Sequence, residues 1–145
     1  YEISNYAKPG YMCRHNAGYW QRREYLGFGL GASSLYRELR FSNTRRMQEY
    51  LTDSGKLEQI RKEVTVLSRN EQIEEFMFLG LRMTEGISEK LFKETFGVRI
   101  MDIYGDILQK YEAIGFMEHI ETKWCLTRKG IHVSNHILAD FLLDE

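Results

Sequence analysis

The sequence predicts an α+β protein in which an incomplete set of strands precedes a mainly helical, winged-helix-like domain. Two observations predict this class. Short runs of β-branched, aromatic and alternating glycine residues mark strands and turns in residues 1–55. Residues 56–145 carry apolar residues at the 3.6-residue spacing of amphipathic helices, bounded by capping residues. We therefore expect two domains, covering residues 1–55 and 56–145.

The first part is expected to hold strands, loops and one helix. Pro9 and Gly10 stop the first strand, and alternating Gly27, Gly29 and Gly31 allow a later strand to approach its neighbour closely. The predicted elements are a strand, a polar aromatic loop, an irregular strand, a hairpin and a short helix, at about residues 1–7, 8–23, 25–36, 35–42 and 44–52.

These strands are too few to close a sheet. Because the chain opens with Tyr1 rather than Met, and a strand is already in progress there, we expect it to be the C-terminal portion of a larger protein. The remainder would supply the rest of a sheet or barrel. The exposed edge of an incomplete sheet can pair with a second copy, so the sequence is compatible with an oligomer.

The second part predicts complete elements with clear ends. Ser68 and Glu71 form a capping box, Gly97 and Gly115 end the second and third helices, and Thr127 caps the last one. The predicted order is three helices, two strands and a final helix, starting at about residues 68, 88, 100, 116, 123 and 127. This order is typical of a winged-helix domain.

Composition excludes several classes of protein. No apolar run approaches the roughly 18 residues of a membrane span, and no signal peptide or lipidation motif is recognisable, so we expect a cytoplasmic protein. Cys13 and Cys125 are too few for a disulfide framework or a closed thiolate metal site. Net charge is −1, but basic residues outnumber acidic ones eight to four in residues 1–50, where an anionic ligand is therefore expected.

One segment near the start offers ligand-binding chemistry, and its candidate residues are Arg14, His15, Asn16, Tyr19 and Trp20. Imidazole is a common axial ligand of heme iron, so His15 is the candidate metal ligand. The rings of Tyr19 and Trp20 can stack on a flat macrocycle, and Arg14 can pair with propionate groups. The alternative is that His15 is an ordinary surface or capping residue, the commoner role of a histidine in a loop.

The winged-helix pattern also occurs in DNA-binding proteins, where a recognition helix enters the major groove. The predicted third helix, residues 100–114, carries Asp102, Asp106 and Glu112 against Lys110. This negative excess would repel phosphate, so we expect no nucleic-acid partner. Its apolar stripe is better explained by packing.

Other patterns are weaker. The glycines of residues 27–32 lack the G-x-G-x-x-G spacing of a dinucleotide site. His132 and His136 lie four residues apart on the predicted last helix, but no third metal ligand is spaced to join them. Because no catalytic triad, phosphate-binding loop or carboxylate pair is visible, we do not expect this chain alone to be an enzyme.

Three ordered segments, YEISNYAKPG, CRHNAGYW and EYLGFGLGASS, resemble the region after the radical-SAM core in oxygen-independent coproporphyrinogen III oxidase-like proteins. Within that family the HemW-type heme chaperones are most similar, because their H-N-x-x-Y-W motif is matched by His15, Asn16, Tyr19 and Trp20. Downstream, EEFMFLGLRMTEGIS and LTRKGIHVSN are similar to the family's C-terminal helical domain.

The resemblance implies that residues 1–55 are the end of a radical-SAM barrel with a heme-motif loop. It implies heme binding through His15 and transfer of heme to acceptor hemoproteins, such as respiratory ones. It further implies S-adenosylmethionine and one 4Fe-4S cluster in the full-length protein, held by a C-x-x-x-C-x-x-C motif. That motif is absent here, and neither Cys13 nor Cys125 replaces it.

Two alternatives remain. The full-length protein would instead be an oxygen-independent coproporphyrinogen III oxidase, an enzyme of porphyrin biosynthesis that decarboxylates propionate side chains through a radical. The H-N-x-x-Y-W motif argues against this, since the true oxidases do not normally carry it. The other alternative is a winged-helix interaction module that binds no ligand.

Overall fold

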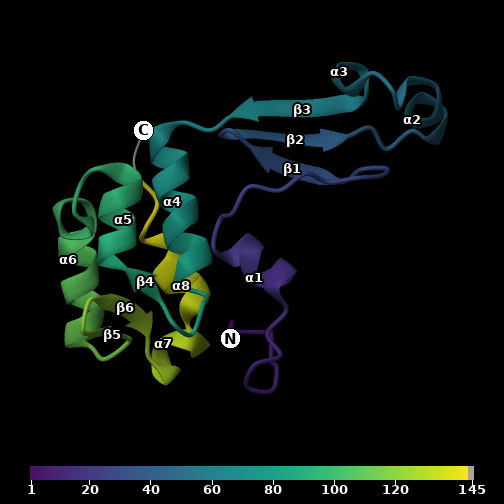
Figure 1. The fold of residues 1–145 in the computed structure, drawn as a ribbon. Coiled ribbons are helices and arrows are strands. Elements are labelled where there is room, and N and C mark those ends of the chain that lie inside the picture. Colours follow the sequence, from purple (N-terminus) through teal and green to yellow (C-terminus); the bar gives the residue numbers. More distant parts are fainter. Residues whose placement is uncertain (144–145) are drawn as a thin grey trace. The chain divides into compact units, whose positions relative to one another are not determined.

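The computed structural model describes residues 1–143, which form two compact units (Figure 1). One unit comprises residues 1–22 together with the chain from Ile73 onward, and the other comprises Arg23–Gln72. This division differs from the predicted boundary at residue 55, because a strand at residues 61–66 pairs back onto the hairpin of the first part. The α+β class is confirmed.

The Arg23–Gln72 unit is an antiparallel sheet of order β1-β2-β3 with two short helices. Its elements are β1 (Ser33–Tyr36), β2 (Leu39–Asn43), α2 (Met47–Asp53), α3 (Leu57–Ile60) and β3 (Arg61–Val66). Arg37 and Glu38 take positive φ angles of 50° and 61° in the tight turn between β1 and β2, which confirms the predicted hairpin. The helix predicted at residues 44–52 is α2, displaced by a few residues.

The predicted close approach at the glycine-rich segment is present. A Cβ added at Gly27 would lie 2.3 Å from the carbonyl oxygen of Ser33, so only glycine fits. The Asn43 side chain donates hydrogen bonds to the carbonyls of Gly27 and Gly29, at 3.2 and 2.9 Å. These bonds fix an otherwise irregular segment against β2.

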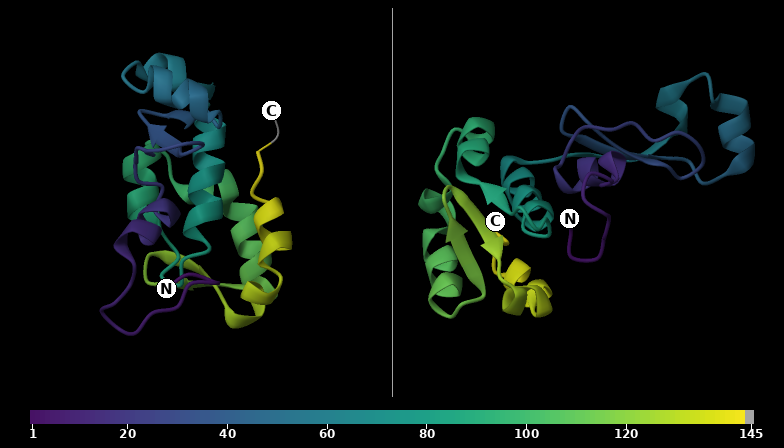
Figure 2. Two further views of the ribbon diagram at one scale, coloured as in Figure 1. Left: turned by 90° about the vertical axis from the view of Figure 1, so that its right-hand side faces the viewer. Right: turned by 60° about the horizontal axis from the view of Figure 1, so that its bottom comes forward.

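The other unit contains the winged-helix-like domain (Figure 2). Its elements are α1 (Arg14–Trp20), α4 (Arg69–Gly80, which begins in the neighbouring unit), β4 (Ile87–Ser88), α5 (Glu89–Phe96), α6 (Ile100–Ala113), β5 (Met117–Ile120), β6 (Lys123–Leu126), α7 (Arg128–His132) and α8 (Ser134–Ala139). The strands form an antiparallel sheet of order β4-β6-β5, and α6 packs against β5. Apolar residues of α4, α5, α6 and α8 build one buried core with this sheet.

The predicted caps form as expected. The backbone N–H of Ser68 donates to the Glu71 carboxylate at 2.7 Å, and the N–H of Glu71 donates to the Ser68 hydroxyl at 3.3 Å. Ser88 accepts from the N–H of Leu91 at the start of α5, and Gly97 ends that helix in the left-handed conformation at φ 72°. Local sequence therefore determines where these helices begin and end.

Three predictions about local structure are wrong. Residues 1–7 form no strand but a turn with isolated bridges, because the Glu2 carboxylate takes the hydrogen bonds of Ser4 and Asn5. The predicted last helix is two short helices, α7 and α8, interrupted at Val133, where poor helix formers cluster. In addition, no strand was predicted at residues 61–66, where β3 forms.

The third error concerns the candidate segment, which is the helix α1 and not a loop. Its sequence contains Gly18, Asn16 and Trp20, which are poorer helix formers than alanine, so propensity alone did not indicate a helix. Tertiary contacts of its inner face, described below, stabilise it instead. None of the helices in residues 1–143 combines the length and the apolar character needed to span a bilayer.

Candidate functional site

The motif residues form two pairs on two adjacent faces of α1, because residues four apart share a helix face and successive residues are about 100° apart around the axis. His15 and Tyr19 form the exposed pair, whereas Asn16 and Trp20 face residues of the N-terminus and of the turn after α4. Ala17, which follows Asn16 in the sequence, is 2% exposed and packs the helix against the rest of its unit. The spacing H-N-x-x-Y-W therefore encodes one accessible pair and one packed pair.

The exposed pair is in direct contact. The Tyr19 hydroxyl lies 2.8 Å from Nε2 of His15, and the two rings meet edge to face with centroids 4.8 Å apart. Tyr19 is 37% exposed, and His15 is also exposed. The imidazole is thus within reach of a ligand from solvent, and a phenol hydroxyl already engages its outer nitrogen.

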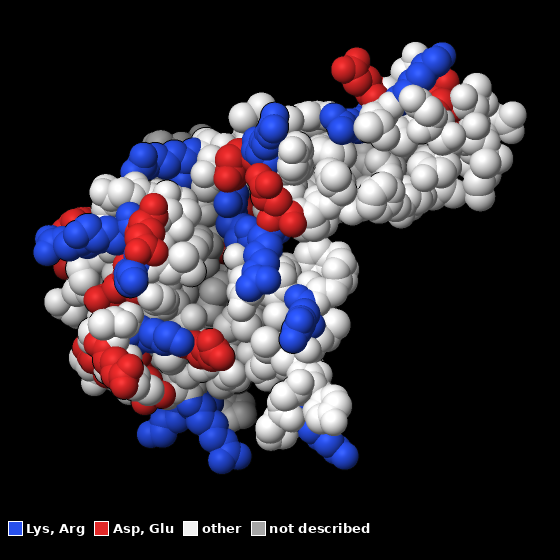
Figure 3. Space-filling view, viewed as in Figure 1, with Lys and Arg blue, Asp and Glu red and all other residues white. Residues whose placement is uncertain are grey.

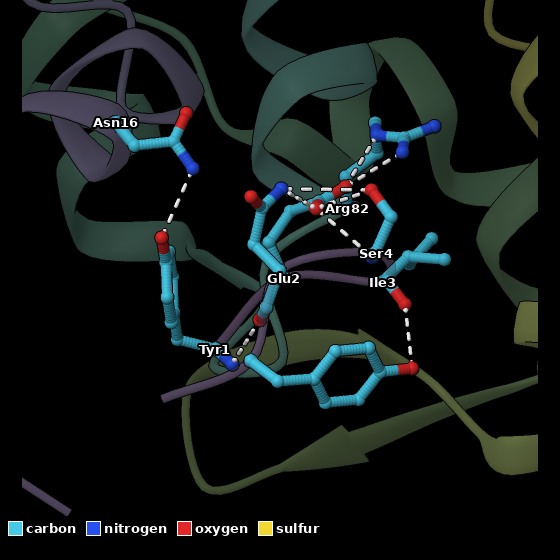
Figure 4. Close-up of polar contacts among 8 residues, drawn as sticks. Tyr1, Glu2, Ile3, Ser4, Asn16 and Arg82 are labelled. Carbon is cyan, nitrogen blue, oxygen red and sulfur yellow. Dashed lines mark hydrogen bonds and ion pairs between the residues drawn. The ribbon is translucent and has the colours of Figure 1, made fainter. Parts of the chain in front are cut away.

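The packed pair holds the helix. The Asn16 side-chain amide donates to the Tyr1 hydroxyl at 3.0 Å, as Figure 4 shows. The guanidinium of Arg82 stacks over the Trp20 ring, 4.8 Å from its centroid. Trp20 Nε1 is buried and, within the described residues, has no hydrogen-bond partner. This ring is packed under Arg82, and its contact with a flat macrocycle stays a prediction.

Arg82 is itself fixed by a buried carboxylate. Its Nε and Nη2 atoms lie 2.8 and 2.6 Å from Oε1 of Glu2, whose side chain is fully buried (Figure 4). Burial alone would raise the pKa of Glu2, but hydrogen bonds from Asn5, Ser4 and Arg82 outweigh it and hold the pKa at about 2. Glu2 is therefore ionised at neutral pH.

Backbone pairing reinforces the same connection. The N–H of Ile3 donates to the carbonyl of Arg82 at 3.0 Å, and the N–H of Thr84 donates to the carbonyl of Tyr1 at 3.1 Å. The turn after α4, the first residues of the chain and α1 therefore form one connected structure. Nothing in the sequence pattern pointed to Arg82 or Glu2, since the two are 80 residues apart.

The basic residues near the motif have different surroundings. Arg14, next to His15 in the sequence, is exposed and could pair with an anionic group. Arg22 lies 3.1 Å from Glu75, and both side chains are largely buried, at 9% and 17% exposed. Arg22 therefore stabilises the unit, whereas the pairing of Arg14 with a propionate stays a prediction.

The cysteines do not form a cluster site. Cys13 is exposed just before α1, whereas Cys125 is buried on β6 with a raised thiol pKa caused mainly by burial. Within residues 1–143, no three His, Cys, Asp or Glu side chains come together to hold a metal ion. His132 and His136 lie on separate helices, α7 and α8. The groups present in this part of the chain do not fit a 4Fe-4S cluster.

The helix α6 packs as predicted. Its apolar residues Ile100, Tyr104, Leu108 and Tyr111 are buried in the core. Its acidic residues Asp102, Asp106 and Glu112 are exposed. On the face of this unit seen in Figure 3, acidic side chains lie among the basic ones.

Comparisons with known proteins agree on one family. The family described as the HemN C-terminal domain matches residues 67–133. Proteins named heme chaperone HemW match the chain at 34% identity in Lactococcus lactis, over 100% of this chain, and at 34% in Bacillus subtilis, over 98%. The one in Escherichia coli is 29% identical over 99% of the chain. The chain spans 38% of the length of each of these relatives.

A solved structure matches as well. Coproporphyrinogen III oxidase (HemN) from Escherichia coli, described as a radical SAM enzyme, aligns with a TM-score of 0.63 over 83% of this chain and 28% of that one. Identity across this alignment is 16%, so the likeness is one of fold. The helical part of the chain therefore has the architecture expected from the sequence.

Proposed function

The chain belongs to the HemW-type heme chaperones, in the family of oxygen-independent coproporphyrinogen III oxidase-like proteins, and from this premise we propose that it is the C-terminal part of a protein that binds heme and passes it to acceptor hemoproteins. In this proposal His15 ligates the heme iron, Tyr19 contacts the macrocycle and Arg14 pairs with a propionate. Respiratory hemoproteins are the proposed acceptors, and the protein itself is proposed to be cytoplasmic.

The observation that carries this proposal is the exposed imidazole of His15 on a helix that is held from an adjacent face. A chaperone must bind its cargo and also release it, so a ligand at the surface suits it better than one in a closed pocket. The packed pair, Asn16 and Trp20, supports the helix that carries the ligand. We therefore assign both residues a role in positioning the helix, beside the heme contact expected of them from the motif.

The full-length protein is proposed to bind S-adenosylmethionine and one 4Fe-4S cluster. Their ligands would have to come from outside this chain, because its cysteines are Cys13 and Cys125 alone and they do not form a site. No step involving the cluster follows from the residues described here. The residues of this chain contribute heme ligation and the helix that presents it.

Heme titration of the full-length protein tests the proposal. Wild type is compared with His15→Ala and with His132→Ala, a control that removes an exposed histidine from α7. We expect a Soret absorbance band that saturates in wild type and in the control, and a large loss of affinity in His15→Ala. Unchanged heme binding in His15→Ala would remove the ligand assignment.

The competing function is the oxidase, favoured only by the shared fold. It predicts that the reconstituted full-length protein decarboxylates coproporphyrinogen III under anaerobic conditions with S-adenosylmethionine. The proposed chaperone function predicts no turnover in this assay. Robust turnover that survives His15→Ala would favour the oxidase.

A further inference from the structure

The contact between Tyr19 and His15 bears on how heme reaches its ligand. The Tyr19 hydroxyl is 2.8 Å from Nε2 of His15, a full hydrogen bond by distance. The edge-to-face contact of the rings, at an interplanar angle of 73°, keeps the hydroxyl at the outer end of the imidazole. The tyrosine therefore occupies the direction from which a ligand would approach that nitrogen.

The outer nitrogen is the one that iron would use. Nδ1 is bonded to the ring carbon that carries Cβ, so a macrocycle bound there would meet the helix backbone. Nε2 lies at the far end of the ring, clear of α1. Metal ligation needs the lone pair of a neutral imidazole nitrogen.

Either tautomer of His15 leaves Nε2 engaged. If Tyr19 donates, the Nε2 lone pair accepts its proton and is not available to a metal. If Nε2 carries the proton, it donates to the Tyr19 oxygen, and that proton must move to Nδ1 before ligation. In both cases the hydroxyl has to leave before a bond to iron forms.

We propose that Tyr19 is a latch on His15 that competes with heme for Nε2. This inference rests on the proposed function, in which His15 ligates heme. The latch reduces the population of His15 that is ready to bind, and apparent affinity falls by that same fraction. It also closes again when heme leaves, so it favours release to an acceptor.

Because both residues lie on one helix, the latch opens through motion of side chains alone. Residues 15 and 19 are one turn apart, so rotation of the tyrosine side chain opens the contact with no change in the backbone. The packed pair on the adjacent face holds α1 while the tyrosine side chain rotates. Opening breaks the exposed hydrogen bond to Nε2, and a net hydrogen-bond contribution of this kind corresponds to an affinity change of about two- to tenfold.

The test is heme titration of the full-length protein carrying Tyr19→Phe, which keeps the ring and removes the hydroxyl. We expect about two- to tenfold tighter binding than in wild type. Tyr11→Phe is the matched control, since Tyr11 is 79% exposed and its hydroxyl makes no contact with His15; it should leave affinity unchanged. Unchanged or weaker binding in Tyr19→Phe would overturn the latch.

Two further variants separate this inference from the proposed function. If His15→Ala binds heme as wild type does, the ligand assignment itself fails. If His15→Ala loses binding while Tyr19→Phe equals wild type, the ligand stands and only the latch fails. The double variant His15→Ala/Tyr19→Phe should bind no better than His15→Ala, because the latch acts through His15; tighter binding would contradict that.

A readout without heme is provided by the imidazole nitrogens. With ¹⁵N-labelled histidine in the full-length protein, Tyr19→Phe should shift the Nε2 resonance of His15 and leave that of His132 in place. A purely structural role for Tyr19 would not move this one nitrogen selectively. An unchanged His15 resonance would show that the hydrogen bond is absent in solution and would overturn the proposal.

Discussion

Arg82 and Glu2 form an ion pair in which the carboxylate is fully buried and the guanidinium is one-quarter exposed. The same guanidinium covers the Trp20 ring on the packed face of α1. One arginine from the turn after α4 thus joins the first residues of the chain to the motif helix.

Replacing Glu2 by Gln should loosen the N-terminal segment. The amide keeps the shape of the carboxylate but loses the charge that Arg82, Ser4 and Asn5 stabilise, a cost of about 1–3 kcal/mol. Amide hydrogen exchange at Ile3 and Thr84, whose N–H groups pair across this contact, should then accelerate by roughly 10- to 100-fold. Glu112→Gln, at an exposed position of α6, should leave both amides as in wild type.

The same carboxylate predicts a pH dependence of known sign. Its pKa is lowered from 4.5 to about 2 in the folded chain, so the ion pair stabilises the fold fully above about pH 4.5. That contribution is lost as pH falls from about 4.5 toward 2, where the folded form also takes up the proton. Exchange protection at Ile3 relative to Glu2→Gln should therefore shrink over this range. A constant difference between pH 5 and pH 2.5 would contradict the assignment.

The sequence predicted best where structure is local. The capping box of Ser68 and Glu71 and the left-handed Gly97 depend on residues within one turn, and both are present. The class of fold and the buried stripe of α6 also follow from short-range periodicity. The helix α1 did not, because its poor helix formers are held by Arg82, which lies more than 60 residues away along the chain.

In the candidate site, too, local sequence identified the residues, and contacts between distant residues determine how they are arranged. The motif identified His15, Asn16, Tyr19 and Trp20 as a group, but their spacing could be interpreted only once the segment was known to be helical. On a helix, residues four apart separate into an exposed and a packed pair. Which pair faces solvent depends on the buried contacts of Trp20, and these involve partners distant in the sequence. Heme binding by these residues stays a prediction.

Two glycines of the helical unit should respond to alanine with opposite signs. At Gly130 on α7 an added Cβ would lie 1.9 Å from the carbonyl oxygen of Phe116, so Gly130→Ala should destabilise by about 1–3 kcal/mol. At Gly105 on α6 the nearest atom is a flexible Met101 methyl group at 3.5 Å. Gly105→Ala should stabilise by about 0.5–1 kcal/mol through helix propensity. Thermal unfolding of the full-length variants compares them, and equal shifts would contradict the packing described at Gly130.

Arg82→Lys should loosen the motif helix while leaving a positive charge beside Glu2. Lysine cannot place a flat guanidinium over Trp20 and keeps fewer hydrogen bonds to the carboxylate. Exchange at the Ala17 and Gln21 amides, which close turns of α1, should accelerate by about three- to tenfold, and by more in Arg82→Ala.

Heme affinity of the full-length protein should fall in Arg82→Lys and fall further in Arg82→Ala. A helix that opens more often presents its ligand for less of the time. Arg99→Ala is the control, since this exposed arginine pairs with Asp102 at the start of α6. If the Ala17 amide exchanged at the wild-type rate in Arg82→Ala, then the contacts of Asn16 and Ala17 would be sufficient to hold α1 without Arg82. Reduced heme affinity in that case would have to come from direct contact between Arg82 and the cargo, which the stacking of its guanidinium on Trp20 opposes.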